Sequence, residues 1–255
     1  PFTYIHPQAK IAEDVIVEPF SVIQKDVEIG EGTWIGNNVT IMEGARIGKN
    51  CKIFPGAVVS SVPQDLKFNG EKTTTEIGDN TIIRECATIS RGTDDRMKTT
   101  IGKNCLIMAY AHVAHDCIVG DFSILVNAVQ LAGHVVIGKN VIIGGTSAVL
   151  QFVHIGDHAM ISGGSKVRKD VPPYVKVGRD PISYVGINSI GLRRKGFSND
   201  KIFAIQDMYR KIYLSGLNNT KALEDIELNM PASEERDQII NFIRKSEKGI
   251  VKGGK

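Results

Sequence analysis

Aliphatic residues recur at every sixth position along the first part of the chain. Ile, Val or Leu occupies 25 of the 28 positions that run from Ile5 to Val167 in steps of six. The positions four residues after each of these hold small or β-branched residues everywhere except at Pro63 and Asn69. Strands bury every second residue and helices every 3.6, so a strict period of six predicts short strands joined by regular corners, as in a parallel β-helix.

Two segments interrupt this six-residue pattern without shifting its register. They are 65–76 and 95–100, where Asp65, Glu71 and Asp95 stand at aliphatic positions. Because both interruptions are whole multiples of six residues, we expect loops that project outward from an uninterrupted scaffold. Long loops on a rigid scaffold are where function tends to concentrate.

The pattern ends after Pro172 and Pro173, and the following residues have the period of helices. From Ser198, a suitable N-cap, to Gly216 the sequence predicts a helix with one apolar face, formed by Ile202, Ile205, Met208, Tyr209 and Ile212.

Two further helices are predicted, one in 221–228 and one after Ser233, whose apolar stripe is Ile239, Ile240 and Ile243. We therefore expect two domains, a β-helix over 1–190 and an α-helical domain over 191–255. Helices at this end would cover the strand edges that an open β-helix exposes.

Composition and charge narrow the class of protein. A net charge of +3, with acidic and basic residues interspersed, leaves no basic stripe for nucleic acid. No apolar stretch approaches the ~20 residues of a membrane span and no secretory signal follows Pro1, so we expect a soluble protein of a reducing compartment. Small-residue positions hold Cys51, Cys105 and Cys117, and Cys86 lies one position earlier, so we expect packed thiols rather than disulfides or zinc ligands.

The hexads IGEGTW, IGNNVT, IGKNCK, IGDNTI, IGKNCL and IGKNVI share an aliphatic residue, Gly, two variable residues, a small residue and a variable one. In this they resemble the hexapeptide-repeat family, whose fold is a left-handed parallel β-helix of triangular cross-section with three hexads per coil. The resemblance implies that residues 18 apart stack at a strand spacing of ~4.8 Å. The 28 hexads would then form about nine coils.

Histidines gather in 112–134. His115 lies outside both inward-facing sets of positions, and Gly133 would stack on it one coil later, as His134 would on Asp116. We therefore expect two imidazoles, a carboxylate and a backbone without a side chain in one patch of outer surface. Acyl transfer needs such groups, a base to deprotonate a hydroxyl and an N–H for the oxyanion.

Single surface histidines are more often solvated or structural than catalytic, and we assign His6 and His154 to that class. Asp65 and Lys67 lie in the first interruption and could bind a sugar or phosphate. The basic segment GLRRKGF, which follows Asn188, could also bind phosphate, because Arg forks suit phosphate geometry.

The ordered set of motifs QDLKFNGE, IRECATISRGT, AHVAHDC, LAGHV, IGGTSAVLQF, DVPPYV and GLRRKGF resembles the UDP-N-acetylglucosamine acyltransferases of lipid A biosynthesis, from Pro1 to about residue 250. The resemblance implies a cytoplasmic homotrimer with sites in the clefts between adjacent β-helices. It also implies transfer of a 3-hydroxyacyl chain from acyl carrier protein to the glucosamine 3-hydroxyl of UDP-GlcNAc, with no metal and no organic cofactor beyond the phosphopantetheine arm of the carrier.

The same resemblance implies roles for particular residues. His115 would be the general base, Asp116 its orienting partner and the Gly133 N–H the oxyanion donor. His112 and His134 would contact the nucleotide sugar or the acyl chain, and Asp65 and Lys67 would contact the sugar end. The uridine diphosphate would be contacted by Gln151, Asn188 and Arg194.

Three positions depart from the family pattern or set its specificity. Leu150 stands where a His is frequent and Ile190 where an acidic residue is expected, which changes the contacts to the nucleotide. Gly163 stands at the position that sets acyl length, and the absence of a side chain there favours a long chain.

Three alternative functions fit parts of the sequence. The related N-acyltransferases of the same pathway carry an extra N-terminal domain, for which a β-helix beginning at Ile5 leaves no room. A zinc carbonic anhydrase of the same fold would need three histidines that converge from two subunits, for which His112, His115 and His134 are candidates. A scaffold without activity would have no use for the His–Asp–His cluster or for the two loops.

Overall fold

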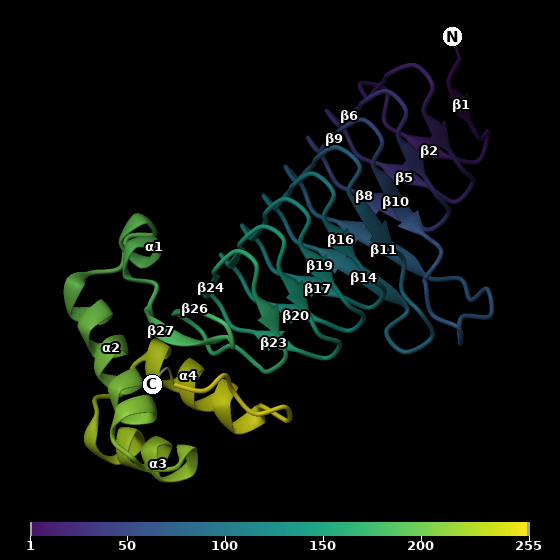
Figure 1. The fold of residues 1–255 in the computed structure, drawn as a ribbon. Helices are drawn as coiled ribbons and strands as arrows, with labels where there is room; N and C mark the ends of the chain where they lie inside the picture. Colours follow the sequence, from purple (N-terminus) through teal and green to yellow (C-terminus); the bar gives the residue numbers. More distant parts are fainter. Residues whose placement is uncertain (1, 254–255) are drawn as a thin grey trace.

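The structure, a computed structural model, describes residues 2–253 as a long β-helix with helices at its C-terminal end (Figure 1). The predicted fold class, a left-handed parallel β-helix followed by α-helices, is confirmed. Three parallel sheets form the faces of the β-helix, and each coil contributes one short strand to each sheet.

Sheet 1 has nine strands, which matches the expected number of coils. In spatial order these are β1 (Tyr4–Ile5), β4 (Val22–Ile23), β7 (Thr40–Ile41), β10 (Val58–Ser61), β13 (Thr88–Ser90), β16 (His112–Val113), β19 (Gln130–Leu131), β22 (Ala148–Val149) and β25 (Lys166–Val167). Sheet 2 consists of β2 (Lys10–Ile11), β5 (Glu28–Ile29), β8 (Ala45–Ile47), β11 (Thr74–Ile77), β14 (Lys98–Ile101), β17 (Ile118–Val119), β20 (Val136–Ile137) and β23 (His154–Ile155).

Sheet 3 continues past the last regular coil. It consists of β3 (Ile16–Val17), β6 (Trp34–Ile35), β9 (Lys52–Ile53), β12 (Ile82–Ile83), β15 (Leu106–Ile107), β18 (Ile124–Leu125), β21 (Ile142–Ile143), β24 (Met160–Ile161), β26 (Val175–Gly178) and β27 (Ser183–Ile187). The last pair, β26 and β27, is antiparallel, so the hairpin ends the parallel stacking of the sheet. The sequence pattern did not predict this hairpin, because its residues lie outside the six-residue frame.

The coil length is 18 residues wherever no loop intervenes, as expected. Val113 pairs with Leu131, and Ile137 with Ile155. The aliphatic positions point inward and stack into a core in which Leu125 and similar side chains are fully buried. Each such side chain stabilises the fold by ~1.5–3 kcal/mol relative to an exposed one.

Corners between strands place one residue in the left-handed backbone region. Asn50, Asn104 and Asn140 have φ of 53°, 55° and 57° at three such corners. Asparagine tolerates this conformation better than most residues with a side chain, which explains the recurring Gly-Lys-Asn sequence of the hexads.

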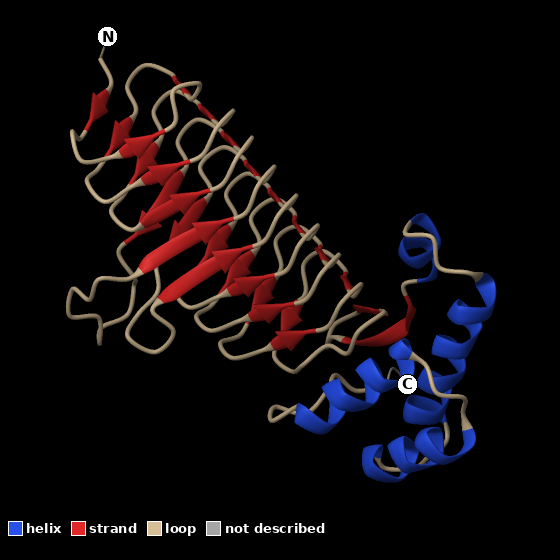
Figure 2. Ribbon diagram, turned by 180° about the vertical axis from the view of Figure 1, so that it is seen from behind, coloured by secondary structure: helices blue, strands red, loops and turns tan. Residues whose placement is uncertain are grey.

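The two loops project from the same corner of the β-helix (Figures 1 and 2). They span 62–73 and 91–97, so each begins and ends three or four residues before the predicted 65–76 and 95–100. The prediction was displaced because β11 and β14 pair with each other over four residues and draw the C-terminal part of each predicted loop into sheet 2.

Four helices follow the β-helix. They are α1 (Ser189–Arg194), α2 (Asn199–Leu214), α3 (Asn219–Asn229) and α4 (Glu234–Lys245). The predicted apolar face of α2 is buried, its N-cap is Ser198, and Ser233 caps α4 as expected. Helix α1 was not predicted, since it is six residues long and buries Leu192 alone; it begins two residues before the predicted domain boundary at 191.

The helices are attached to the end of the β-helix by specific contacts. The Tyr209 hydroxyl, on α2, donates a hydrogen bond of 2.6 Å to the Pro173 carbonyl, and the rings of Tyr184 and Tyr213 stack with centroids 4.3 Å apart. None of the helices in residues 2–253 is long and apolar enough to cross a membrane.

Candidate active site

The predicted cluster lies at one corner of two consecutive coils, between sheets 1 and 2. His115 and Asp116 occupy the corner between β16 and β17, and Gly133 and His134 the corner between β19 and β20. Both loops leave this same corner, one from the coil of β10 and β11 and the next from the coil of β13 and β14. Whole-hexad insertions therefore place the loops directly beside the histidines.

His115 and Asp116 form a hydrogen-bonded pair. The His115 Nδ1 lies 2.8 Å from the Asp116 Oδ2. A carboxylate accepts hydrogen bonds only, so this contact places a proton on Nδ1 and leaves Nε2 able to accept one. That is the arrangement of an imidazole that acts as a general base.

Gly133 stacks on the His115 ring, as predicted. A Cβ atom on Gly133 would lie 2.6 Å from the His115 Cε1 and 2.7 Å from its Nε2, closer than real Cβ contacts occur. Glycine is required here by the close approach of the imidazole, and any side chain would displace the ring. Among residues 2–253 no backbone carbonyl or side chain accepts a hydrogen bond from the Gly133 N–H, so this donor is free to bind an oxyanion next to the imidazole.

The expectation that the cluster lies on the outer surface was wrong. His115 and His134 are each 7% exposed and Asp116 is 0% exposed. Residues of the second loop cover the cluster: Asp116 is hydrogen-bonded to Thr93, and the Asp95 Oδ2 lies 3.1 Å from the His134 Nδ1, although without hydrogen-bond alignment. The sequence pattern placed the loop but not the direction in which it folds.

The Asp116 carboxyl is held in its ionised form. Burial by itself would raise its pKa, but hydrogen bonds from Thr93 and His115 outweigh burial and bring the pKa below the ordinary value of 3.8. Asp116 thus remains a charged acceptor for the His115 N–H at neutral pH.

His134 is fixed by its neighbours. Its ring stacks on Phe152 with centroids 4.5 Å apart and meets the His115 ring edge-on at 5.1 Å. Its Nε2 lies 3.8 Å from the Asp116 Oδ2, so Asp116 faces both imidazoles.

A cavity of ≈ 360 Å³ opens beside the cluster along sheet 1. His112, His115 and Gly133 line it together with Ala148 and Val149. The His112 Nδ1 is 2.7 Å from the Thr88 hydroxyl, and burial, together with the nearby His115, lowers the pKa of His112 below 6.5. Neutral polar groups and an apolar wall suit a ligand that carries both hydroxyls and hydrocarbon.

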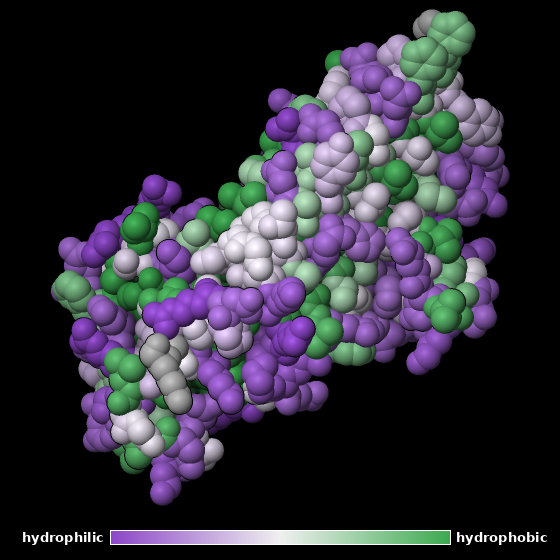
Figure 3. All heavy atoms as spheres, in the orientation of Figure 1, coloured by the Kyte–Doolittle hydropathy of each residue, from purple (hydrophilic) through white to green (hydrophobic). Residues whose placement is uncertain are grey.

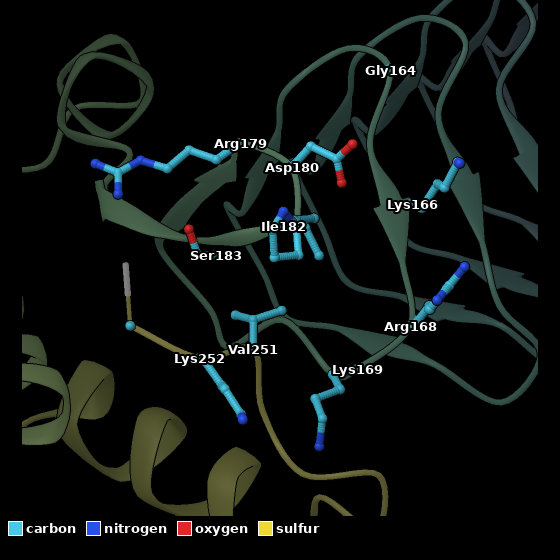
Figure 4. Close-up of a pocket in the computed structure, with 12 residues that line it drawn as sticks. Gly164, Lys166, Arg168, Lys169, Arg179, Asp180, Ile182, Ser183, Val251 and Lys252 are labelled. Carbon is cyan, nitrogen blue, oxygen red and sulfur yellow. The ribbon is translucent and has the colours of Figure 1, made fainter. Parts of the chain in front are cut away.

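A second, larger cavity of ≈ 730 Å³ lies at the C-terminal end of the β-helix (Figure 4). Ile182 and Val251 give it an apolar centre, and Figure 4 shows basic side chains on both flanks, from Lys166, Arg168, Lys169, Arg179 and Lys252. Because Lys166 pairs with Ala148 in neighbouring strands, the two cavities follow one another along sheet 1.

The remaining predicted residues are dispersed. The Asp65 Oδ2 lies 3.9 Å from the His115 Nε2, whereas Lys67, Gln151, Gly163 and Arg194 are exposed and outside both cavities. Asn188 is buried: its side chain caps α1 by accepting from the Gly191 N–H and donates to the His158 carbonyl. Leu150 and Ile190, the two departures, are exposed.

The structure also brings in residues that the sequence did not single out for chemistry. Thr93, Asp95, Arg96 and Thr99 all contact the cluster, and the Thr99 hydroxyl accepts from the Asp116 N–H at 2.8 Å. The break in the six-residue pattern at Asp95 predicted a loop in this region. It did not predict which residues of the cluster the loop would contact.

His115, Asp116 and His134 could together hold a metal ion, because one ligand atom from each lies within 4.8 Å of the others. His112 is outside this group. The four cysteines are free, and burial raises the pKa of Cys105 to about 11 and that of Cys117 to about 12, which makes both poor nucleophiles.

Comparisons with known proteins find similar sequences over the whole chain. Residues 170–251 match the family model described as UDP-N-acetylglucosamine O-acyltransferase, domain 2, and residues 26–61, 98–133 and 134–169 match the bacterial transferase hexapeptide model. The chain is 46% identical over 255 residues to the acyl-[acyl-carrier-protein]–UDP-N-acetylglucosamine O-acyltransferase of Thiobacillus denitrificans, covering 99% of this chain and 98% of that protein.

Solved structures give the same result. The UDP-N-acetylglucosamine acyltransferase of Bacteroides fragilis is 49% identical with a TM-score of 0.97, covering 99% of each chain. That of Campylobacter jejuni is 32% identical with a TM-score of 0.94, covering 100% of this chain and 99% of that one.

The stability of the fold should depend on pH through Asp116. A carboxyl whose pKa is lower in the folded state stabilises the fold above its unfolded pKa of 3.8, and this contribution is lost as the pH falls through the folded value. Asp116→Asn keeps the shape and tolerates the φ of 59°. The difference in unfolding free energy between wild type and the variant should therefore shrink from pH 6 to about pH 3.

Urea denaturation at each pH and at one protein concentration would measure this difference. His112 also loses stabilising free energy as the pH falls through 6.5, because its pKa is lowered in the folded state. This contribution is the same in both proteins, so it cancels in the difference. A difference that stays constant across the range would contradict the assignment of Asp116 as an ionised, hydrogen-bonded group.

Proposed function

The chain belongs to the family of acyl-[acyl-carrier-protein]–UDP-N-acetylglucosamine O-acyltransferases, and we propose that it transfers a 3-hydroxyacyl chain from acyl carrier protein to the glucosamine 3-hydroxyl of UDP-GlcNAc with His115 as general base. This would be the first step of lipid A biosynthesis, carried out in the cytoplasm. The observation that carries the proposal is the stacking of the His115 ring on Gly133, within hydrogen-bond reach of Asp116.

The mechanism follows from these three residues. The His115 Nε2 takes the proton of the sugar hydroxyl while the hydroxyl oxygen attacks the thioester carbonyl. The carbonyl oxygen becomes an oxyanion that accepts a hydrogen bond from the Gly133 N–H. Collapse of this intermediate breaks the carbon–sulfur bond. The protonated His115 then donates its proton to the departing thiolate of the phosphopantetheine arm.

Asp116 supports both halves of this cycle. Its ionised carboxylate holds the Nδ1–H of His115 and stabilises the imidazolium that forms after proton transfer. The mechanism uses protein groups and the carrier thioester alone.

We further propose that the substrates occupy the cavity along sheet 1. His112 and His134 would contact the sugar or acyl chain, and Asp65, 3.9 Å from the His115 Nε2, the sugar end together with Lys67. Gln151, Asn188 and Arg194 remain candidates for the uridine diphosphate. The amide oxygen and the amide nitrogen of Asn188 both make hydrogen bonds within the protein. A contact from Asn188 to the uridine diphosphate would therefore be additional to its role as the N-cap of α1.

The acyl chain would extend along sheet 1 toward the second cavity. The support is that the two cavities adjoin and that Pro181 and Ile182 give the second an apolar floor. Gly163 lies next to Gly164, which lines this cavity, so a side chain at 163 would narrow the path.

We also propose a homotrimer with one site at each interface. The cavity beside His115 is open, and a site that excludes water from an acyl transfer needs a wall on its open side. Apolar side chains are exposed at the corner of the cluster one coil further on, at Leu150 and Phe152, and Figure 3 shows apolar patches between polar ones along the β-helix. A second copy of the chain would cover them.

His115→Ala should lower kcat by about 10²-fold or more, because a general base contributes 10²–10⁴-fold. His154→Ala provides the matched control, since His154 is exposed on β23 and away from the cluster. Turnover of UDP-GlcNAc with an acyl carrier protein donor would be measured for both, alongside thermal melting to show that the fold is intact. Equal losses in the two variants would rule out His115 as the base.

Gly163→Met should shift the preference toward shorter donors. Each buried methylene contributes up to ~0.8 kcal/mol, so loss of room for two carbons would change selectivity by roughly ten-fold. Donors of about ten to sixteen carbons span the range over which such steps add up. The KM for UDP-GlcNAc should barely change, because the obstruction lies on the lipid side.

Gly163→Ala is the control for the backbone, since a Cβ at 163 lies 3.2 Å from the Gly145 carbonyl oxygen and tests that contact alone. A length profile unchanged in Gly163→Met would place the determinant of acyl length elsewhere, most simply near Pro181.

Light scattering at micromolar concentration should give three times the chain mass of 27.8 kDa. A mass equal to that of one chain would overturn the homotrimer and with it the proposed location of the site between subunits.

A further inference from the structure

Asp116 is held at each of its polar atoms by the second loop and the strand that follows it. The Thr93 N–H donates to Oδ1 at 3.0 Å and the Thr93 hydroxyl to Oδ2 at 2.6 Å. Arg96 donates to the Asp116 carbonyl at 2.9 Å, and the Asp116 N–H donates to the Thr99 hydroxyl. This loop therefore determines how the Asp116 carboxylate is oriented.

The direction of the Thr93 hydroxyl bond is fixed by its other partner. The Asp95 N–H donates to the Thr93 Oγ1 at 3.4 Å, so the hydroxyl proton is free to point at Asp116. The loop itself is closed by the Met97 N–H, which donates to the Thr93 carbonyl at 2.8 Å. Thr93 is 5% exposed, and in the interior such a charge-assisted bond is stronger than a neutral one.

Orientation matters because two imidazoles compete for one carboxylate oxygen. The Asp116 Oδ2 lies 2.8 Å from the His115 Nδ1 and 3.8 Å from the His134 Nε2. Rotation of the carboxylate would bring it closer to His134 and release the His115 N–H. His115 would then lose both its fixed tautomer and the charge that stabilises its protonated form.

We propose that Thr93 is a positioning residue, which clamps the Asp116 carboxylate on His115 rather than on His134. The inference rests on the proposed role of His115 as general base. It gives the second loop a function, since the six added residues bring a backbone N–H and a hydroxyl to the one carboxylate that the base requires.

Thr93→Val tests the hydroxyl alone, because it keeps the backbone N–H and the shape of the side chain. We expect kcat to fall by about ten-fold, the scale of one charge-assisted hydrogen bond, with KM for UDP-GlcNAc changed by less than about two-fold. Thr93→Ser restores the hydroxyl and should restore most of the rate.

Thr33→Val is the matched control. Thr33 is buried at an equivalent position of the six-residue frame, and its hydroxyl donates to the Gly48 carbonyl at 2.9 Å and accepts from the Cys51 N–H at 3.0 Å. The Thr33→Val variant therefore also loses one buried hydroxyl, at a place on the β-helix that is far from His115. The melting temperature of Thr33→Val should fall as well, while its kcat stays at the wild-type value.

A double-mutant cycle separates positioning from a structural effect. In an Asp116→Asn background the ionised carboxylate is absent, so Thr93→Val should lower kcat no further. A full ten-fold loss in that background, or an unchanged kcat for Thr93→Val in the wild-type background, would overturn the proposal. His115→Ala, assayed in parallel, tests the base itself, and a His115→Ala enzyme of normal activity would refute the proposed function independently of Thr93.

Discussion

Parallel pairing at a fixed interval of 18 residues is the constraint on which the rest of the structure depends. It places Val113 beside Leu131 and, two residues further along, His115 beside Gly133. Distance along the sequence therefore converts directly into distance in space, and a site can be assembled from residues that the frame aligns. Each coil contacts its neighbours alone, so a corner can be specialised without disturbing the packing further along.

The two loops are inserted at one corner without disturbing the packing of the neighbouring coils. Both leave the β-helix at the corner that carries His115, and both are insertions of whole hexads, so the aliphatic positions on either side remain in line. One loop brings Asp65 near the imidazole and the other brings Thr93 onto Asp116. The rigid scaffold carries His115, Asp116 and Gly133, and the irregular chain carries the groups that contact the His115–Asp116 pair.

The parts that the sequence could predict are those that repeat. The coil register, the stacking of His115 on Gly133 and the buried face of α2 all follow from a period, and the structure confirms each of them. The burial of Asp116 and its contact with Thr93 do not follow, because they depend on how an irregular loop folds back on its own corner. Helix α1 was missed for a related reason, since one buried residue, Leu192, leaves no periodic signal.

The close contact between Gly133 and His115 makes the two positions mutually dependent in evolution. Any side chain at 133 would displace the imidazole, so a change there requires a compensating change at position 115. The corners are also part of the packed core, because Cys117 and Val135, two residues after His115 and Gly133, are both fully buried. The residue at 133 and the residue at 115 can thus change only together.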